Sequence, residues 1–240
     1  SKVQDPYSFR CAPQVHGAVY EALIGMRETI QIELNSTTDN PLVFPETTDH
    51  QSTIISQGNF HGEILALCAD RMSLALFELG SISERRMDQL LDSKKSGLPP
   101  FLATNSGLES GMMIVQYSAG SALAEMHGHA APRTSFSTST SAGQEDHVSM
   151  GATACWNLYQ SCIRLSEVLA CELVIACQGL EYNSLNPAPF VKSLHKLVRT
   201  ISPKLTKDRS TSTELQSIAK ILREGTWLSR IEAENERLVR

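Results

Sequence analysis

Long amphipathic helical patterns dominate this chain and limit the folds that it can adopt. In four stretches, apolar residues recur at every third or fourth position, as they do on one face of an α-helix: 12–34, 59–91, 108–130 and 145–182. The alternating pattern of strands is nearly absent. Helices of this length bury their apolar faces only by packing against neighbours of comparable length. The sequence therefore predicts an all-α fold built on a bundle of long helices.

Turn-forming residues separate these helices and mark off a different C-terminal region. Pro41 blocks continuation of the first helix, and residues 42–58 are expected to be irregular or extended. We expect residues 1–185 to form the central bundle part and residues 186–240 to form a C-terminal helical segment. Its three shorter helices are predicted at 190–201, 212–223 and 228–239.

Composition excludes several classes of partner. The 240 residues carry a net charge of -5 and no basic stripe, which argues against a nucleic-acid partner. No apolar run reaches the roughly 20 residues of a membrane span, so no membrane partner is expected. The six cysteines form no CxxC pair, and the four in the last long helix are expected to be buried. This usage predicts reduced thiols and a cytoplasmic protein. Because three or four long helices make a thin core, oligomerisation is expected.

The N-terminal segment Gln4-Asp5-Pro6-Tyr7-Ser8-Phe9-Arg10-Cys11 contains one candidate pair of functional residues. Arg10 could bind a carboxylate through two hydrogen bonds, and the Tyr7 hydroxyl could transfer a proton. Spacing alone favours the simpler interpretation, a surface tyrosine beside an ordinary arginine.

Two further segments concentrate polar and aromatic groups at predicted helix starts. The first is Gly58-Asn59-Phe60-His61-Gly62-Glu63, in which Asn59 could cap a helix. The second is Gln144-Glu145-Asp146-His147, whose carboxylates could act as a general base or stabilise the start of the longest helix. For this second segment the two interpretations are compatible.

A pair resembling metal ligands is also present, in the third long helix. Glu125 and His129 lie one helical turn apart, with His127 between them. No third ligand is evident in this helix, and imidazoles two positions apart point to different helix faces. The sequence therefore predicts no metal site.

Taken together, seven segments resemble the carboxy-terminal half of the histidine and aromatic amino-acid ammonia-lyases. They occur in the family's order and at similar separations over residues 3–185. The matching segments are Val3 to Cys11, Pro13 to Gly17, Asp39-Asn40-Pro41, Gly58 to Gly62, Ser83-Glu84-Arg85-Arg86, Ser96-Gly97-Leu98-Pro99 and Gln144 to Gly151.

The resemblance implies an all-α homotetramer with a central bundle of long helices, and active sites that draw on more than one subunit. It implies elimination of ammonia from an α-amino acid, with a methylidene-imidazolone electrophile formed from an Ala-Ser-Gly triplet. This sequence contains no such triplet. We therefore expect the chain to be the carboxy-terminal half of a lyase, active only with an amino-terminal half present as a separate chain or fragment.

The resemblance also implies roles for individual residues. Arg10 matches the arginine that binds the substrate carboxylate, Tyr7 the tyrosine beside the electrophile, and Gln4 lies in the same wall. Phe60 matches the aromatic residue that packs near the substrate ring. The catalytic residues are thus expected to be Tyr7, Arg10 and Glu145, and the substrate-binding residues Gln4, Arg10, Phe60, Gln144 and Glu145.

Glu145 bears on the substrate through the same resemblance. Family members acting on phenylalanine or tyrosine usually carry glutamine there, whereas the histidine enzymes carry glutamate, with Gln144 as its amide neighbour. The match therefore favours L-histidine as substrate and urocanate as product. In one respect the chain departs from the histidine enzymes, because residues 131–137 lack their His-Pro and Ser-Val-Asp-Ser elements.

Two alternatives remain open at this level. One is a phenylalanine or tyrosine ammonia-lyase, or an aminomutase with the same electrophile. The other is a non-catalytic regulatory helical paralogue that binds lyase subunits. An Ala-Ser-Gly-bearing partner that co-purifies would favour an enzyme over the second alternative.

Overall fold

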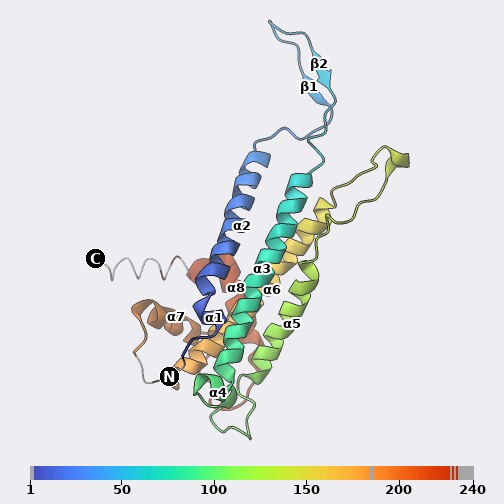
Figure 1. The fold of residues 1–240 in the computed structure, drawn as a ribbon. Helices are drawn as coiled ribbons and strands as arrows, with labels where there is room; N and C mark the ends of the chain where they lie inside the picture. The colour runs from blue at the N-terminus through green and yellow to red at the C-terminus, as the bar shows by residue number, and fades with distance from the viewer. Residues whose placement is uncertain (1–2, 184–185, 228, 230, 232–240) are drawn as a thin grey trace.

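Four long helices form an elongated bundle in the computed structural model, which describes residues 3–183, 186–227, 229 and 231 (Figure 1). They are α2 (Ala12–Glu33), α3 (Glu63–Leu91), α5 (Met113–His129) and α6 (Gly151–Leu180). Helix α3 is the central element, because it packs against α2, α5 and α6. The predicted all-α long-helix bundle is confirmed.

Small and apolar side chains let these helices approach closely. Ala119 of α5 is fully buried, and a Cβ at Gly80 of α3 would lie only 3.2 Å from Leu123. Close approach of this kind increases the number of van der Waals contacts along the helix pair. Fully buried members of the core include Met87, Met126, Val168, Val174 and Ile175.

Short elements occupy the two ends of the bundle. The end that carries the N-terminus holds α1 (Tyr7–Arg10), α4 (Ser93–Ser96) and the 3-10 turn η1 (Pro100–Leu102). At the opposite end, β1 (Leu42–Phe44) pairs antiparallel with β2 (Thr53–Ile55) in a hairpin, with Val43 opposite Ile54. The expected excursion over 42–58 is therefore partly extended. The loop before α6, which contains the 3-10 turn η2 (Ser141–Gly143), lies at the hairpin end (Figure 1).

Three helices begin later than their apolar patterns predict. Helix α3 begins at Glu63 instead of 59, because Gly62 adopts a left-handed conformation with φ of 73°. Helix α5 begins at Met113 instead of 108, after a turn that includes Gly111 with φ of 56°. Helix α6 begins at Gly151 instead of 145, because Met150 has φ of 55° and interrupts the helical backbone. Side-chain periodicity does not report these backbone reversals.

A partly buried ion pair joins α3 to α6. Two nitrogens of the Arg86 guanidinium donate to the two carboxylate oxygens of Glu172, and the Nη2–Oε2 distance is 3.0 Å. The Ser83 hydroxyl donates to the same carboxylate at 2.5 Å. Nearby, the buried Glu84 accepts hydrogen bonds from Arg85 and Gln116. The segment Ser83 to Arg86 is thus largely an internal network between helices.

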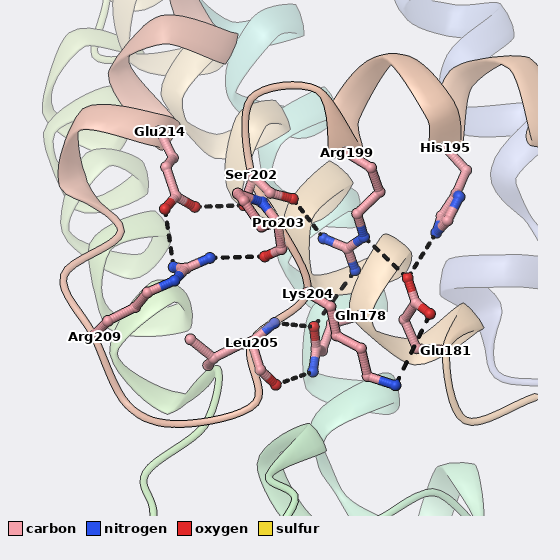
Figure 2. Close-up of polar contacts among 10 residues, drawn as sticks. All are labelled: Gln178, Glu181, His195, Arg199, Ser202, Pro203, Lys204, Leu205, Arg209 and Glu214. Atoms are coloured by element: carbon pink, nitrogen blue, oxygen red, sulfur yellow. Dashed lines mark hydrogen bonds and ion pairs between the residues drawn. The ribbon is translucent and has the colours of Figure 1, made fainter.

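The C-terminal segment packs on α6 through α7 (Pro189–Arg199) and α8 (Ser212–Glu224). Figure 2 shows the polar contacts that attach it. The buried Gln178 side chain exchanges two hydrogen bonds with the Leu205 backbone, and Glu181 accepts hydrogen bonds from Arg199 and His195.

The predicted helix at 228–239 lies almost entirely outside the described residues. The division of the chain between residues 185 and 186 stays a prediction. Among the helices that the structure describes, none combines the length and hydropathy that crossing a bilayer requires.

The cysteine prediction was only half right. Burial raises the pKa of the Cys171 thiol to about 12 and that of Cys177 to about 11, so both behave as inert core groups. Cys155 and Cys162, in contrast, are exposed on this chain. Their helix face in the first half of α6 is not covered by other parts of the described chain, which the apolar pattern alone could not reveal.

Candidate active site

One groove brings together the predicted residues Phe60, Gln144 and Glu145. It encloses about 630 Å³ between the turn that precedes α3 and the loop that precedes α6. Phe60 is 57% exposed, and Gln144 and Glu145 are exposed as well. The groove therefore offers an aromatic face, an amide and a carboxylate to a small molecule.

A tight loop fixes the backbone of Glu145. Thr140 N–H donates to the Glu145 carbonyl at 2.9 Å, Glu145 N–H donates back at 3.3 Å, and the Thr140 hydroxyl donates to the Glu145 carboxylate. Between them, Ser141 and Ala142 have positive φ angles of 50° and 54°, which are unfavourable for residues with a Cβ. A strained loop of this kind is stable only where surrounding contacts hold it in place, and here the hydrogen bonds between Thr140 and Glu145 do so.

The helix-cap interpretation of Glu145 was therefore wrong. Its carboxylate is bound by Thr140, and α6 begins only at Gly151. Sequence reasoning missed the supporting residues Thr140 and Ser137. The Ser137 hydroxyl accepts from Val148 N–H at 2.9 Å and donates to its carbonyl at 3.1 Å. Neither residue belongs to a recognisable motif, because these contacts depend on loop closure and not on sequence spacing.

The turn before α3 is connected to this loop. His61 Nε2 lies 3.1 Å from the His147 carbonyl oxygen, and the two imidazole rings stack with centroids 5.6 Å apart. Phe60 and Glu145 therefore belong to two segments that are held together. The Asn59 cap interpretation was wrong, because Gly62 occupies the cap position without a side-chain hydrogen bond.

Tyr7 and Arg10 form a second cluster at the other end of the bundle. The Arg10 guanidinium carbon lies 5.0 Å from the Tyr7 ring centroid, in cation–π geometry. Tyr7 is 71% exposed and lines a groove of about 410 Å³ that is also lined by Ile82 and Arg85 of α3. Gln4 is exposed just before α1.

The two clusters are far apart within one chain. Tyr7 lies beside Ile82, whereas Phe60 and His61 precede Glu63 at the start of α3. The length of α3 from Glu63 to Ile82 is roughly 28 Å at about 1.5 Å per residue. A small amino acid cannot contact both clusters of the same chain, so the six predicted residues form two separate clusters.

Two of the residues that resemble metal ligands in α5 contact side chains of other helices. Glu125 accepts an ion pair from Arg164 at 2.7 Å, and the His127 ring packs edge-on against Phe77. Glu125 and His127 thus contact other helices of the bundle, whereas Nδ1 of His129 is buried without a hydrogen-bond partner among the described residues.

Comparisons with known proteins identify the family. A family model described as aromatic amino acid lyase matches residues 1–200. Histidine ammonia-lyase from Geobacillus sp. (strain WCH70) is 44% identical over 227 residues, and histidine ammonia-lyase from Deinococcus radiodurans is 48% identical over 208 residues. These alignments cover 94% and 87% of this chain but only 44% and 39% of the relatives. The chain thus spans less than half the length of the curated relatives that it matches.

Solved structures agree with this result. Histidine ammonia-lyase from Trypanosoma cruzi superimposes with a TM-score of 0.89 at 39% identity, over 96% of this chain and 45% of that one. Tyrosine aminomutase from Streptomyces globisporus gives a TM-score of 0.90 at 32% identity, over 97% of this chain and 44% of that one. The helical bundle is therefore that of a known enzyme fold, and the chain belongs to the aromatic amino acid lyase family.

Proposed function

We propose that this chain supplies two half-sites of an ammonia-lyase that converts L-histidine to urocanate and ammonia. The observation that carries the proposal is the carboxylate of Glu145 in a groove with the Phe60 ring. A carboxylate can accept a hydrogen bond from an imidazole N–H and offset its positive charge, whereas an unsubstituted phenyl ring offers no such donor. The curated relatives described above are histidine ammonia-lyases, which supports the same substrate.

The electrophile is proposed to come from outside this chain. The sequence has no Ala-Ser-Gly triplet from which a methylidene-imidazolone could form. Two aromatic side chains, Tyr7 and Phe60, fit contact with such a group, because each lines a groove and is more than half exposed. When bound, the group would supply the electron sink that makes loss of ammonia possible.

The residues of this chain bind and orient the substrate in the proposed site. Arg10 would bind the α-carboxylate through two parallel hydrogen bonds, with its guanidinium held over the Tyr7 ring. The Glu145 carboxylate, restrained by Thr140, would accept a hydrogen bond from the substrate imidazole or ammonium. The Tyr7 hydroxyl could accept or donate a proton next to the electrophile.

The assembly follows from the separation of the half-sites. We propose a cytoplasmic homotetrameric arrangement in which the Arg10 cluster of one subunit faces the Glu145 cluster of another, with an amino-terminal half completing each site. Closed symmetric assemblies readily form sites of this kind between subunits. Exposed apolar residues near the grooves, such as Trp156 and Tyr159, offer surface for such contacts.

Replacing Glu145 with glutamine tests the substrate. We expect Glu145→Gln to lower kcat/KM for L-histidine by about 10- to 100-fold, since a hydrogen bond to a charged partner contributes about 1.5–3 kcal/mol. The measurement is urocanate formation, followed by ultraviolet absorbance in the complete assembly. Glu28→Gln, at an exposed position of α2, is the matched control and should leave kcat/KM unchanged. Equal kcat/KM values for Glu145→Gln and this control would reject the assignment.

Analysis of the reaction products distinguishes an ammonia-lyase from an aminomutase. The similarity to tyrosine aminomutase makes an aromatic amino acid a second substrate class. A lyase releases ammonia and an unsaturated acid, whereas an aminomutase returns a β-amino acid. Incubation with histidine, tyrosine and phenylalanine, followed by mass spectrometry, distinguishes these outcomes. Absence of turnover in an assembly that contains an Ala-Ser-Gly-bearing chain would instead favour a regulatory paralogue.

A further inference from the structure

Two imidazoles and one carboxylate converge where the turn before α3 meets the loop before α6. One potential ligand atom from each of His61, Glu63 and His147 lies within 4.8 Å of the other two. The elimination proposed above uses none of these three side chains. The side chains of His61 and Glu63 are 35% and 37% exposed, so a dissolved ion can reach them.

The hydrogen bond from His61 to His147 leaves the other ring nitrogen of His61 facing the carboxylate of Glu63. A carbonyl oxygen can only accept, so the 3.1 Å contact with His147 requires His61 Nε2 to carry the hydrogen. In the neutral ring, Nδ1 then presents a lone pair, and it lies 3.6 Å from Glu63 Oε2. That oxygen is itself buried and accepts no hydrogen bond from the described residues. A metal ion bound between these two acceptor atoms would satisfy both of them.

We propose that His61, Glu63 and His147 bind a divalent transition-metal ion of the zinc class. Two imidazoles and one carboxylate are a ligand set that zinc commonly takes, with a fourth position left for water. A metal-bound histidine usually donates its other ring N–H to a carboxylate or a backbone carbonyl, which fixes the ring orientation. The bond from His61 Nε2 to the His147 carbonyl has this form.

The backbone conformation at Gly62 lets the side chains of His61 and Glu63 point toward each other although they are only two positions apart. Gly62, with φ of 73°, reverses the chain between His61 and Glu63, so these side chains do not follow helical spacing. His147 comes from the loop that also carries Glu145, and it lines the same groove as Phe60. A bound ion would therefore link the two segments that form this half-site. The proposal does not rest on histidine being the substrate.

Zinc binding to the protein in its native assembly tests the proposal directly. After removal of metals with a chelator, titration calorimetry should show one Zn²⁺ per chain. Co²⁺ at the same site should give the visible absorption of a nitrogen- and oxygen-ligated ion. His147→Ala and Glu63→Gln should each weaken Zn²⁺ binding by about tenfold or more. His50→Ala, an exposed histidine beyond the hairpin strands, is the control and should bind as tightly as the unmodified protein.

Each outcome decides the question independently of turnover. Circular dichroism establishes that the variants keep their helices, and His147→Gln provides a second variant with a neutral polar side chain. Equal Zn²⁺ affinities for the unmodified protein and the His147 variants would overturn the proposal. An absence of Zn²⁺ binding to the unmodified protein would also overturn it.

Discussion

The proposed role of Arg10 depends on the planar shape of its guanidinium group as well as on its charge. Spacing alone favoured an ordinary surface arginine, and the structure does place it on the surface, stacked on Tyr7. Its proposed role depends on two parallel hydrogen bonds to a carboxylate, which a planar guanidinium can make and an ammonium cannot. Arginine and lysine carry the same charge, so replacing Arg10 with lysine tests whether the two parallel hydrogen bonds matter.

Arg10→Lys is expected to lower kcat/KM by about 30-fold or more, because loss of a bidentate contact removes roughly 2–4 kcal/mol of transition-state stabilisation. Steady-state kinetics on the complete assembly measures the effect. Arg27→Lys, at an exposed position of α2, is the matched control. A loss below tenfold in kcat/KM would exclude bidentate binding by Arg10.

At the scale of the elements, polar pairs determine how helices pack in register. The side chains of Arg86 of α3 and Glu172 of α6 are 16% and 19% exposed, and they meet between the two helices. Removing one partner leaves the other charge buried without compensation, which is more costly than removing both. The pair therefore favours one alignment of the two longest helices over shifted alternatives.

We expect Arg86→Leu to lower the free energy of unfolding by about 3–5 kcal/mol, measured by chemical denaturation. The double variant Arg86→Leu/Glu172→Leu should recover most of this loss, because it removes both charges of the pair. Lys220→Ala breaks the exposed pair with Glu224 and should cost less than about 1 kcal/mol. If the single and double variants were equally unstable, lost packing would be the cause instead of the unpaired charge.

Docking of the C-terminal helices on α6 should depend on pH through Glu181 (Figure 2). Desolvation alone would raise the pKa of this carboxyl, but hydrogen bonds from Arg199 and His195, together with their charges, lower it below its ordinary value of 4.5. A carboxyl with a lowered pKa in the folded state stabilises that state above its ordinary pKa. This stabilisation is lost as the pH falls through the lowered value.

Thermal unfolding between pH 6 and pH 3 can test this dependence. Glu181→Gln should be less stable than the unmodified protein near pH 6, and the difference should shrink as the pH falls below about 4.5. The control Glu224→Gln removes a carboxyl that is 48% exposed and has a lysine partner at 3.8 Å, so a smaller difference is expected. A stability difference for Glu181→Gln that does not change with pH would contradict the role of its charge.

On the scale of the whole molecule, the roughly 28 Å between the two clusters is the decisive feature. If each active site combines Arg10 of one subunit with Glu145 of another, mixed assemblies of two inactive variants should regain activity. Refolding Arg10→Ala together with Glu145→Gln should restore about a quarter of the sites by random assortment. Activity of the mixture against that of each parent variant is the measurement.

The matched control for this experiment pairs two changes within one cluster. Phe60→Ala and Glu145→Gln line the same groove of one chain, so no mixed assembly contains an unmodified copy of that half-site. This mixture should stay inactive. Equal recovery in both mixtures, or in neither, would show that the two half-sites do not combine between subunits.

The sequence by itself determined the fold class and the family. Long runs of three- and four-residue periodicity have few stable solutions other than a helix bundle, and seven ordered segments are specific to one enzyme family. The helix bodies were predictable for the same reason, since burial of one helix face controls the pattern along 12–33, 63–91 and 151–180.

Only the tertiary structure decided the helix starts, the loop that holds Glu145 and the grouping of the functional residues. Backbone reversals at Gly62 and Met150 have no signature in apolar periodicity. The contacts of Glu145 with Thr140, and of His61 with His147, join segments through loop closure. A linear motif records which side chains are present, whereas the length and packing of α3 set the distance between them and divide six predicted residues into two clusters.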